Sequence, residues 1–182
     1  DGGIRAFGPN KRAAIIEGSK VFSKNFMKKY NIPTAQFEVF DERNAAIEFL
    51  RDCSYPVVVK ADGLAFGKGV IIAKNFEEAK EAVDSCMVGR QFGEAGSRIV
   101  IEEFMVGPEI SVLCFTDGEH IVPMPSAQDH KKIYEGDKGP NTGGMGAFSP
   151  SMHYTEEIAD YCMEHIFMPT VEAMGSEDRT FK

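Results

Sequence analysis

Residues 57–73 read VVVKADGLAFGKGVIIA, and this stretch decides the fold. Two β-branched runs, residues 57–60 and 70–73, flank a glycine-rich segment, which is the pattern of two strands joined by a hairpin. Such a segment can present backbone N–H groups and the Lys68 ammonium to phosphate oxygens. The alternative is an ordinary glycine-rich turn whose lysine is solvated.

The glycine-rich segment matches neither of two common phosphate-binding motifs. Compared with a P-loop, it is one residue short between its glycines, and Gly69 stands where Ser or Thr would ligate magnesium. A P-loop also leads into a helix, whereas a β-branched run follows here. A dinucleotide fingerprint fails because Ile72 occupies the position of its third glycine. The pattern therefore predicts a flap at a hairpin tip.

Hydrophobic periodicity outside this stretch predicts further helices and strands. Helices are expected over residues 17–30, 41–54, 75–87 and from 155 onward, and strands over residues 98–104, 109–115 and 120–124. The last two strands should form a hairpin. Asn31 should stop the first helix, and Asp41, Asn75 and Thr155 are the expected N-caps of the others. Pro169 must end or kink the last helix.

Residues 125–150 are rich in Gly, Pro, Asp and Lys and show no periodicity. This predicts a single loop far longer than the usual connection of about 4–6 residues. Loops of that length usually bind something, so we expect part of a functional site here.

Composition bounds the class of protein. The 182 residues are 43% hydrophobic, enough for one sizeable core or two small lobes. A net charge of -8 argues against long nucleic acid as a partner. Four cysteines without a Cys-x-x-Cys pair favour reduced thiols in a cytoplasmic protein, and no apolar run predicts a membrane helix or signal peptide. The chain opens with Asp1 rather than Met and has no terminal cap, so we expect a fragment.

Five blocks of sequence, taken in order, resemble one family. They are Gly8-Pro9, EGSK at 17–20, VKADGL at 59–64, QDHK at 128–131 and GPNTGGMGA at 139–147. Together they resemble the glycinamide ribonucleotide synthetase family of the ATP-grasp superfamily, and the resemblance covers almost the whole chain. GPNTGGMGA is highly specific, whereas the flap alone is weak. Phe66 replaces the usual Ala, which affects flap flexibility or adds an apolar cover, and Lys132 replaces a common Arg.

The resemblance implies an α+β (α/β) fold of the ATP-grasp type. Residues 1–36 would be the tail of an N-terminal domain and the start of the central ATP-grasp domain. Residues 37–107 would form a small lid lobe of antiparallel strands and helices. Residues 108–182 would be part of the central α/β domain, truncated at Lys182.

The resemblance also implies an ATP site. Its residues would be Lys20, Lys60, Gly67, Lys68, Gly69, Glu102, Glu103, Phe104 and Glu109. Lys20 and Lys60 would neutralise phosphate oxygens beneath the flap. Glu102 would accept from the adenine amino group, the backbone of residues 103–105 would contact the ring edge, and Glu109 would hold the ribose hydroxyls. The alternatives are surface lysines and carboxylates on a solvent face.

Substrate contacts are expected in the long loop. Asp129 and Lys131 would position the amine and phosphate of phosphoribosylamine, and Asn141, Gly143 and Gly144 would form a backbone cradle, with a plain multi-turn loop as the alternative. His130 has no companion at metal-ligand spacing, which favours a structural or solvated histidine over a zinc ligand. No catalytic residue or metal ligand is assigned; the Mg²⁺ ligands, a Glu and an Asn, are expected beyond Lys182.

The activity implied is an ATP-dependent ligase of de novo purine synthesis. ATP would phosphorylate the carboxylate of glycine, and 5-phosphoribosylamine would attack the glycyl phosphate to give glycinamide ribonucleotide, ADP and phosphate. The remaining domains of the parent enzyme would be partners, and the fragment alone would be inactive. Two alternatives stay open: another ATP-grasp carboxylate-amine ligase, against which Asp129 and residues 141–147 argue, and a nucleotide-binding module without catalysis.

Overall fold

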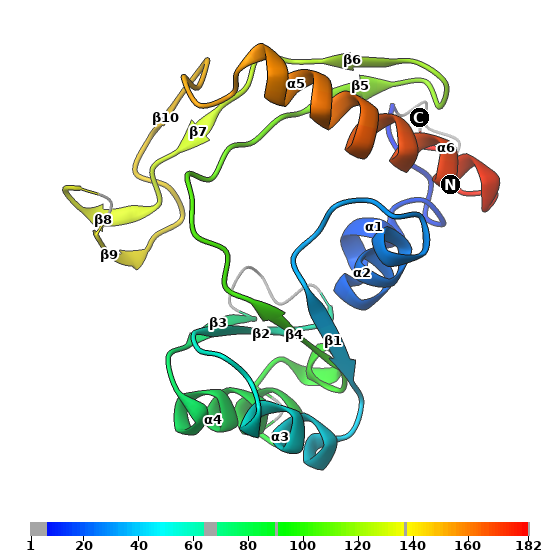
Figure 1. Ribbon diagram of the computed structural model, residues 1–182. Helices are drawn as coiled ribbons and strands as arrows, with labels where there is room; N and C mark the ends of the chain where they lie inside the picture. The colour runs from blue at the N-terminus through cyan, green and yellow to red at the C-terminus, as the bar shows by residue number, and fades with distance from the viewer. Residues whose placement is uncertain (1–6, 64–68, 90, 137, 182) are drawn as a thin grey trace. The chain divides into compact units, whose positions relative to one another are not determined.

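The computed structural model describes residues 7–63, 69–89, 91–136 and 138–181. The chain divides into two compact units. One is Lys11–Met105, and the other combines Val106–Lys182 with the N-terminal segment up to Asn10. Figure 1 shows the elements of each unit in chain order, coloured from blue to red. The expectation of a lid lobe over residues 37–107 stays a prediction, because this division follows compactness and not function.

A four-stranded antiparallel sheet forms the centre of the Lys11–Met105 unit. Its strands are β1 (Phe37–Phe40), β2 (Val57–Ala61), β3 (Val70–Ala73) and β4 (Ile99–Glu103), in the order β1-β4-β2-β3. β2 and β3 pair with Val57 opposite Ala73 and Lys60 opposite Val70. The hairpin predicted from residues 57–73 is therefore confirmed.

Two helices, α3 (Arg43–Arg51) and α4 (Phe76–Met87), cover one face of this sheet (Figure 1). Val59 and Ile101 on the strands and Leu50 on α3 belong to the same buried apolar cluster. Side chains alternate between the two faces of a strand, so Lys60 and Glu102, each next to a core residue, point to the opposite face. The sheet thus has an apolar face and a charged one.

The start of α4 confirms one predicted cap. Asn75 Oδ1 accepts from the Glu78 N–H at 2.9 Å, and Glu78 Oε1 accepts from Asn75 Nδ2 at 3.0 Å. The predicted cap by Asp41 is wrong, because α3 begins at Arg43 and its N-cap position is Glu42, whose side chain makes no cap hydrogen bond. Asp41 lies one residue too early to reach the first turn.

The single helix predicted over residues 17–30 is interrupted. The structure has a short α1 (Ile15–Gly18) and then α2 (Lys20–Lys29), with Ser19 extended between them. Ser19 Oγ accepts from the Phe22 N–H at 3.0 Å, so it acts as the N-cap of α2. The chain leaves the helix at Asn31, whose φ of +55° is the left-handed conformation expected at a helix stop.

In the other unit, β5 (Cys114–Thr116) and β6 (Ile121–Pro123) form the predicted hairpin, although β5 is shorter than expected. The prediction of one unstructured loop over residues 125–150 is wrong. That segment contains four short strands in two antiparallel pairs: β7 (Gln128–Asp129) with β10 (Ala147–Phe148), and β8 (Lys132–Tyr134) with β9 (Lys138–Asn141). Strands this short carry no readable alternation.

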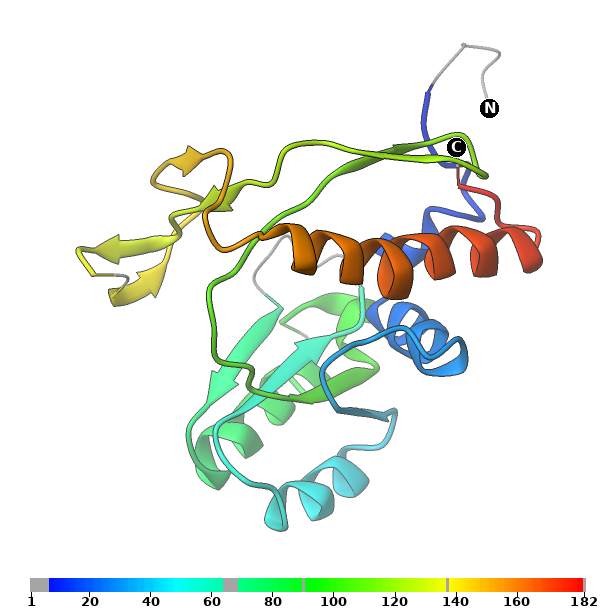
Figure 2. The ribbon, with the colours of Figure 1, turned by 45° about the horizontal axis from the view of Figure 1, so that its top comes forward.

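The last helix begins as predicted, with Thr155 Oγ1 accepting from the Ile158 N–H at 3.4 Å. It continues as α5 (Glu156–Cys162), a π-helical turn over Met163–Phe167 and α6 (Met168–Ser176), which follow one another as a continuous helical path (Figure 2). Pro169 lies in the first turn of α6, directly after the π turn, where a missing N–H is tolerated, so the helical path does not end at this residue; the alternative expectation of a kink there stays a prediction. Across the described ranges, no helix has the length and apolarity needed to cross a membrane.

Cys86 gives the core a measurable pH dependence. Its side chain is fully buried on α4, and burial raises the pKa of the thiol from 9.0 to about 11. A group whose pKa is higher in the folded state contributes stability that is complete below its unfolded pKa and is lost as pH rises through the folded value. We expect the free energy of unfolding to fall by about 1–2 kcal/mol more between pH 8.5 and 10.5 in the native chain than in Cys86→Ala.

Urea unfolding of both proteins at each pH measures this difference. Other groups titrate equally in the two chains, so only the difference between the two slopes reports on Cys86. Parallel pH curves would contradict the assignment.

Candidate functional site

The charged face of the sheet carries a buried carboxylate bound by two lysines. Glu102 on β4 is only 4% exposed. Its Oε2 lies 2.8 Å from Lys60 Nζ and 3.2 Å from Lys24 Nζ. Lys60 comes from the neighbouring β2 strand, and Lys24 comes from α2. Two cations therefore share one carboxylate oxygen, and this pairing compensates for the burial of the carboxylate.

The second carboxylate oxygen of Glu102, Oε1, differs from the first in its hydrogen bonding. Oε1 is buried and has no hydrogen-bond partner among the residues that the structure describes. Buried polar atoms are nearly always paired, so an unpaired acceptor at this position is a feature that a ligand donor can satisfy. An amino group is the donor that the sequence prediction places there.

Lys24 is a site residue that sequence reasoning missed. It is 8% exposed, its Nζ donates to Thr34 Oγ1 at 2.6 Å, and it lies 5.4 Å from the centroid of the Phe37 ring. Burial lowers the pKa of Lys24, and the neighbouring Glu102 opposes that shift. The signal in the sequence was a lysine on the apolar stripe of a helix, between Val21 and Phe26, which are also buried.

The glycine-rich segment is anchored where it leaves β2. Asp62 is buried, and its Oδ1 accepts from Ser19 Oγ and from the Val21 N–H, both at 2.8 Å. Its Oδ2 accepts from Arg98 Nη2 at 2.6 Å. Lys20 Nζ donates to the Gly63 carbonyl at 2.9 Å, which places this predicted phosphate lysine at the base of the segment.

The far end of the segment is held as well. The Gly69 carbonyl accepts from the Ala61 N–H at 2.9 Å, which closes the hairpin below the flap. Gly67 and Lys68, the other two predicted flap residues, lie outside the described residues.

The backbone predicted to contact the adenine ring edge, residues 103–105, begins where β4 ends. Glu103 exchanges two hydrogen bonds with Gln36: its N–H donates to the Gln36 carbonyl at 3.0 Å, and its Oε1 accepts from the Gln36 N–H at 2.8 Å. Phe104 follows the strand and is partly exposed. The Glu103 N–H is thus already engaged, and contact with an adenine edge by N–H groups would fall to the residues after it.

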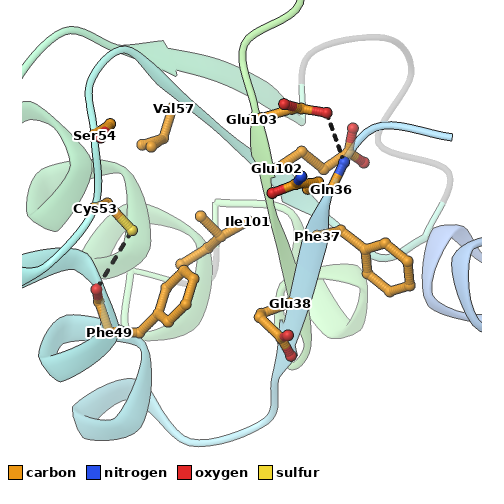
Figure 3. Close-up of a pocket in the computed structure, with 10 residues that line it drawn as sticks. All are labelled: Gln36, Phe37, Glu38, Phe49, Cys53, Ser54, Val57, Ile101, Glu102 and Glu103. Carbon is orange, nitrogen blue, oxygen red and sulfur yellow. Dashed lines mark hydrogen bonds between the residues drawn. The ribbon is translucent and has the colours of Figure 1, made fainter.

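A cavity of about 440 Å³ opens beside this strand end (Figure 3). It is lined by Gln36, Phe37, Glu38, Phe49, Cys53, Ser54, Val57, Ile101, Glu102 and Glu103. Figure 3 shows the Glu103 carboxylate directed to the Gln36 backbone. Neither Lys20 nor Lys60 is among the described lining residues. Two of the lining residues, Val57 and Ile101, belong to the buried apolar face of the sheet, so the cavity lies at the end of β4 on the side of α3 and not on the face that carries the Lys60 and Glu102 side chains.

The second unit brings two predicted residues together. Lys131 Nζ lies 2.9 Å from Glu109 Oε1, and this carboxylate raises the pKa of Lys131. The sequence prediction gave the two side chains separate duties, Glu109 to the ribose and Lys131 to the substrate. Both side chains are partly or largely exposed, so the pair contributes at most about 1 kcal/mol of stability.

The predicted substrate cradle folds around Asp129. His130 and residues 142–146 exchange backbone hydrogen bonds: the His130 N–H donates to the Gly146 carbonyl at 2.8 Å, and the Met145 N–H donates to the His130 carbonyl at 2.7 Å. Gly144 has a φ of +123°, and a Cβ there would lie 3.2 Å from Asp129 Oδ1, so only glycine fits without strain. Asp129 and Gly144 are thus neighbours.

The remaining predicted substrate residues lie in the same pair of segments. Asn141 pairs with Lys132 at the end of β9, and Gly143 follows it in the turn. The His130 ring lies 5.3 Å from the Phe148 ring, in keeping with a structural role. Within the part of the chain that the structure describes, no three His, Cys, Asp or Glu side chains are grouped to hold a metal ion. The binding roles of all these residues stay predictions.

Comparisons with known proteins agree with the resemblance found in the sequence. Residues 18–182 match the family model described as phosphoribosylglycinamide synthetase, ATP-grasp (A) domain. The chain is 52% identical over 179 residues to a chloroplastic phosphoribosylamine–glycine ligase of Arabidopsis thaliana, covering 98% of this chain and 34% of that protein. It is 50% identical over 179 residues to the phosphoribosylamine–glycine ligase of Salmonella typhimurium, covering 98% and 42%.

Solved structures extend the comparison to the fold. The phosphoribosylamine–glycine ligase of Thermotoga maritima superposes with a TM-score of 0.88 at 39% identity, covering 97% of this chain and 44% of that one. The biotin carboxylase domain of a Hydrogenobacter thermophilus 2-oxoglutarate carboxylase superposes with a TM-score of 0.72 at 19% identity, which shows a shared fold alone. The predicted α+β fold of the ATP-grasp type is therefore confirmed. The chain spans less than half the length of these relatives.

Asp62 allows a test of the anchor at the base of the flap. Asp62→Asn replaces one acceptor oxygen by an NH₂ group, so the side chain can no longer serve Ser19, Val21 and Arg98 together. We expect the free energy of unfolding to fall by about 2–4 kcal/mol, measured by urea unfolding, because buried partners are left unpaired.

Asp84→Asn is the matched control. Asp84 also pairs with an arginine, Arg43, but the Asp84 side chain is 35% exposed against 10% for Asp62, so the same substitution should cause a clearly smaller loss. Equal losses in the two variants would contradict the anchor role.

Proposed function

Since this chain belongs to the phosphoribosylglycinamide synthetase ATP-grasp (A) domain family, we propose that it is the nucleotide-binding part of a ligase that joins glycine to 5-phosphoribosylamine. ATP and both substrates would be its small-molecule partners, and the remaining domains of the parent enzyme its protein partners. The products are glycinamide ribonucleotide, ADP and phosphate. One observation carries the proposal: buried Glu102 has two lysines on one oxygen, and its other oxygen accepts a hydrogen bond from none of the described residues.

The arrangement around Glu102 suits an adenine nucleotide. Its Oε1 can accept from the exocyclic amino group of adenine, while Phe104 and the residue after it offer backbone groups to the ring edge. Glu109 is assigned to the ribose hydroxyls. A carboxylate is an acceptor only, so it favours a base with an amino group at this position over one with a carbonyl.

The phosphate end of the site is assigned to the cations and the flap. Lys20 at the base of the glycine-rich segment and Lys60 on β2 offset charge on the γ-phosphoryl group as it transfers, together with Gly67, Lys68 and Gly69. Lys60 is already held at Glu102, so it is positioned before nucleotide arrives. Exclusion of water protects the acyl phosphate from hydrolysis.

The proposed ligase reaction proceeds in two steps. A carboxylate oxygen of glycine attacks the γ-phosphorus of ATP, which forms glycyl phosphate and releases ADP. The amine of 5-phosphoribosylamine then attacks the carbonyl carbon: a C–N bond forms, the C–O bond to phosphate breaks, and the amine loses a proton. Asp129, Lys131 and the cradle of Asn141, Gly143 and Gly144 are assigned to binding the phosphoribosylamine.

Magnesium, expected with ATP in such ligases, finds no ligand set in the described ranges of this chain, where no three candidate side chains converge. We therefore assign no residue here to the metal and no step to it. For the location, we propose the cytoplasm, because all four cysteines are free thiols, which suits a reducing compartment.

The full-length protein provides the test of this function. We expect ADP release to require both glycine and 5-phosphoribosylamine. Lys60→Met should lower kcat/KM for ATP by about 10- to 100-fold, the loss expected for a charge-assisted contact of about 1.5–3 kcal/mol. A coupled ADP assay measures both effects.

Lys74→Met is the control, because Lys74 is exposed and lies outside the proposed site. ADP release that is indifferent to glycine would overturn the ligase assignment in favour of another ATP-grasp activity. The absence of any nucleotide turnover would favour a binding module.

A further inference from the structure

Lys24 is the one member of the Glu102 cluster to which no role has yet been given. Its Nζ contacts Glu102 Oε2 at 3.2 Å and Thr34 Oγ1 at 2.6 Å, and its side chain is buried. Lysine is almost never buried without a partner, because removing an ammonium from water is unfavourable. Lys24 keeps its place through these two hydrogen-bond partners and the Phe37 ring beside it.

The two lysines differ in what else they can reach. The Lys60 side chain is 26% exposed and is assigned to phosphate oxygens, whereas the Lys24 side chain is 10% exposed and faces Thr34. When a nucleotide draws Lys60 toward its phosphates, Lys24 still holds Glu102 Oε2. The carboxylate then keeps its orientation.

We propose that Lys24 is a positioning residue for nucleobase recognition: by holding Glu102 Oε2, it directs Oε1 to accept a hydrogen bond from the exocyclic amino group of adenine. This inference rests on the proposed function, which assigns Glu102 to the adenine. Lys24 itself touches no substrate. Its effect is confined to the one hydrogen bond that Glu102 makes to the base.

This role predicts that Lys24 matters only for nucleotides whose base carries an exocyclic amino group. Adenine has an amino donor at C6, whereas unsubstituted purine has only hydrogen there and forms no such bond. Loss of Lys24 should therefore weaken the binding of ATP and leave purine riboside triphosphate unaffected. A lysine that merely stabilised the fold would weaken the binding of both nucleotides alike.

The experiment measures the Kd of both nucleotides for the full-length protein and its Lys24→Met variant by isothermal titration calorimetry. In the native protein ATP should bind more tightly than purine riboside triphosphate. Lys24→Met should weaken ATP binding by about tenfold, the value of one charge-assisted hydrogen bond, and change the Kd of the analogue by less than about twofold. An equal loss for both nucleotides, or no loss for either, would overturn the proposal.

Lys28→Met is the matched control. Lys28 lies on the same helix and 5.6 Å from the same Phe37 ring, but it is exposed and no ion pair joins it to Glu102 in the described structure. This variant should retain the native ratio of the two Kd values. If Lys24→Met does not fold, Thr34→Val removes the second partner of Lys24 and should shift the ratio in the same direction by about two- to threefold; an unchanged ratio would then count against the proposal.

The native protein separates the two proposals. If it binds ATP and the analogue equally, Glu102 does not contact the amino group, and the proposed adenine site fails. If it prefers ATP and Lys24→Met keeps that preference in full, the adenine site stands and only the role of Lys24 fails.

Discussion

One buried carboxylate sets the requirements for the Lys11–Met105 unit. Glu102 lies on β4, which is flanked by β1 and β2 in the sheet. A charge at this depth is tolerated only when cations or hydrogen bonds surround it. β2 supplies Lys60 and α2 supplies Lys24, so the placement of two further elements is tied to this one side chain. The position of α2 therefore serves two purposes: it buries the apolar stripe of the helix, and it places a cation beside the Glu102 carboxylate.

Alternation along the strands separates stability from ligand contact. Val59 and Ile101 point into the core beneath α3 and α4, and their neighbours Lys60 and Glu102 point to the other face. The apolar cluster can therefore fix the sheet without contributing an atom to the predicted site. Asp62 is the exception, because this buried residue follows β2 directly and connects the strand to the start of α2 and to Arg98.

Local signals predicted the parts of the fold that depend on neighbours in sequence. The hairpin of β2 and β3 and the cap at Asn75 each follow from residues only a few positions apart. The break between α1 and α2 at Ser19 could not be predicted from neighbouring residues, because the Ser19 hydroxyl donates to Asp62, 43 residues further along the chain. The short strand pairs β7 with β10 and β8 with β9 were not predicted for a different reason. Each pair is held by backbone hydrogen bonds, which leave no side-chain pattern in the sequence.

Local sequence patterns also fail to reveal the long-range contacts of the candidate site, although they contain a signal for one of them. The family resemblance predicted Lys60 and Glu102 as site residues, but Lys24 gains its importance from its contact with Glu102, which no local pattern contains. Each partner is nevertheless visible in the sequence as a charged residue in an apolar pattern: Lys24 lies on the apolar stripe of a helix, and Glu102 lies in a buried β run. Two misplaced charges of opposite sign in one small unit have a low-energy solution only if they meet. Such a pairing of Lys24 with Glu102 places α2 next to β4 and makes Lys24 the third member of the cluster.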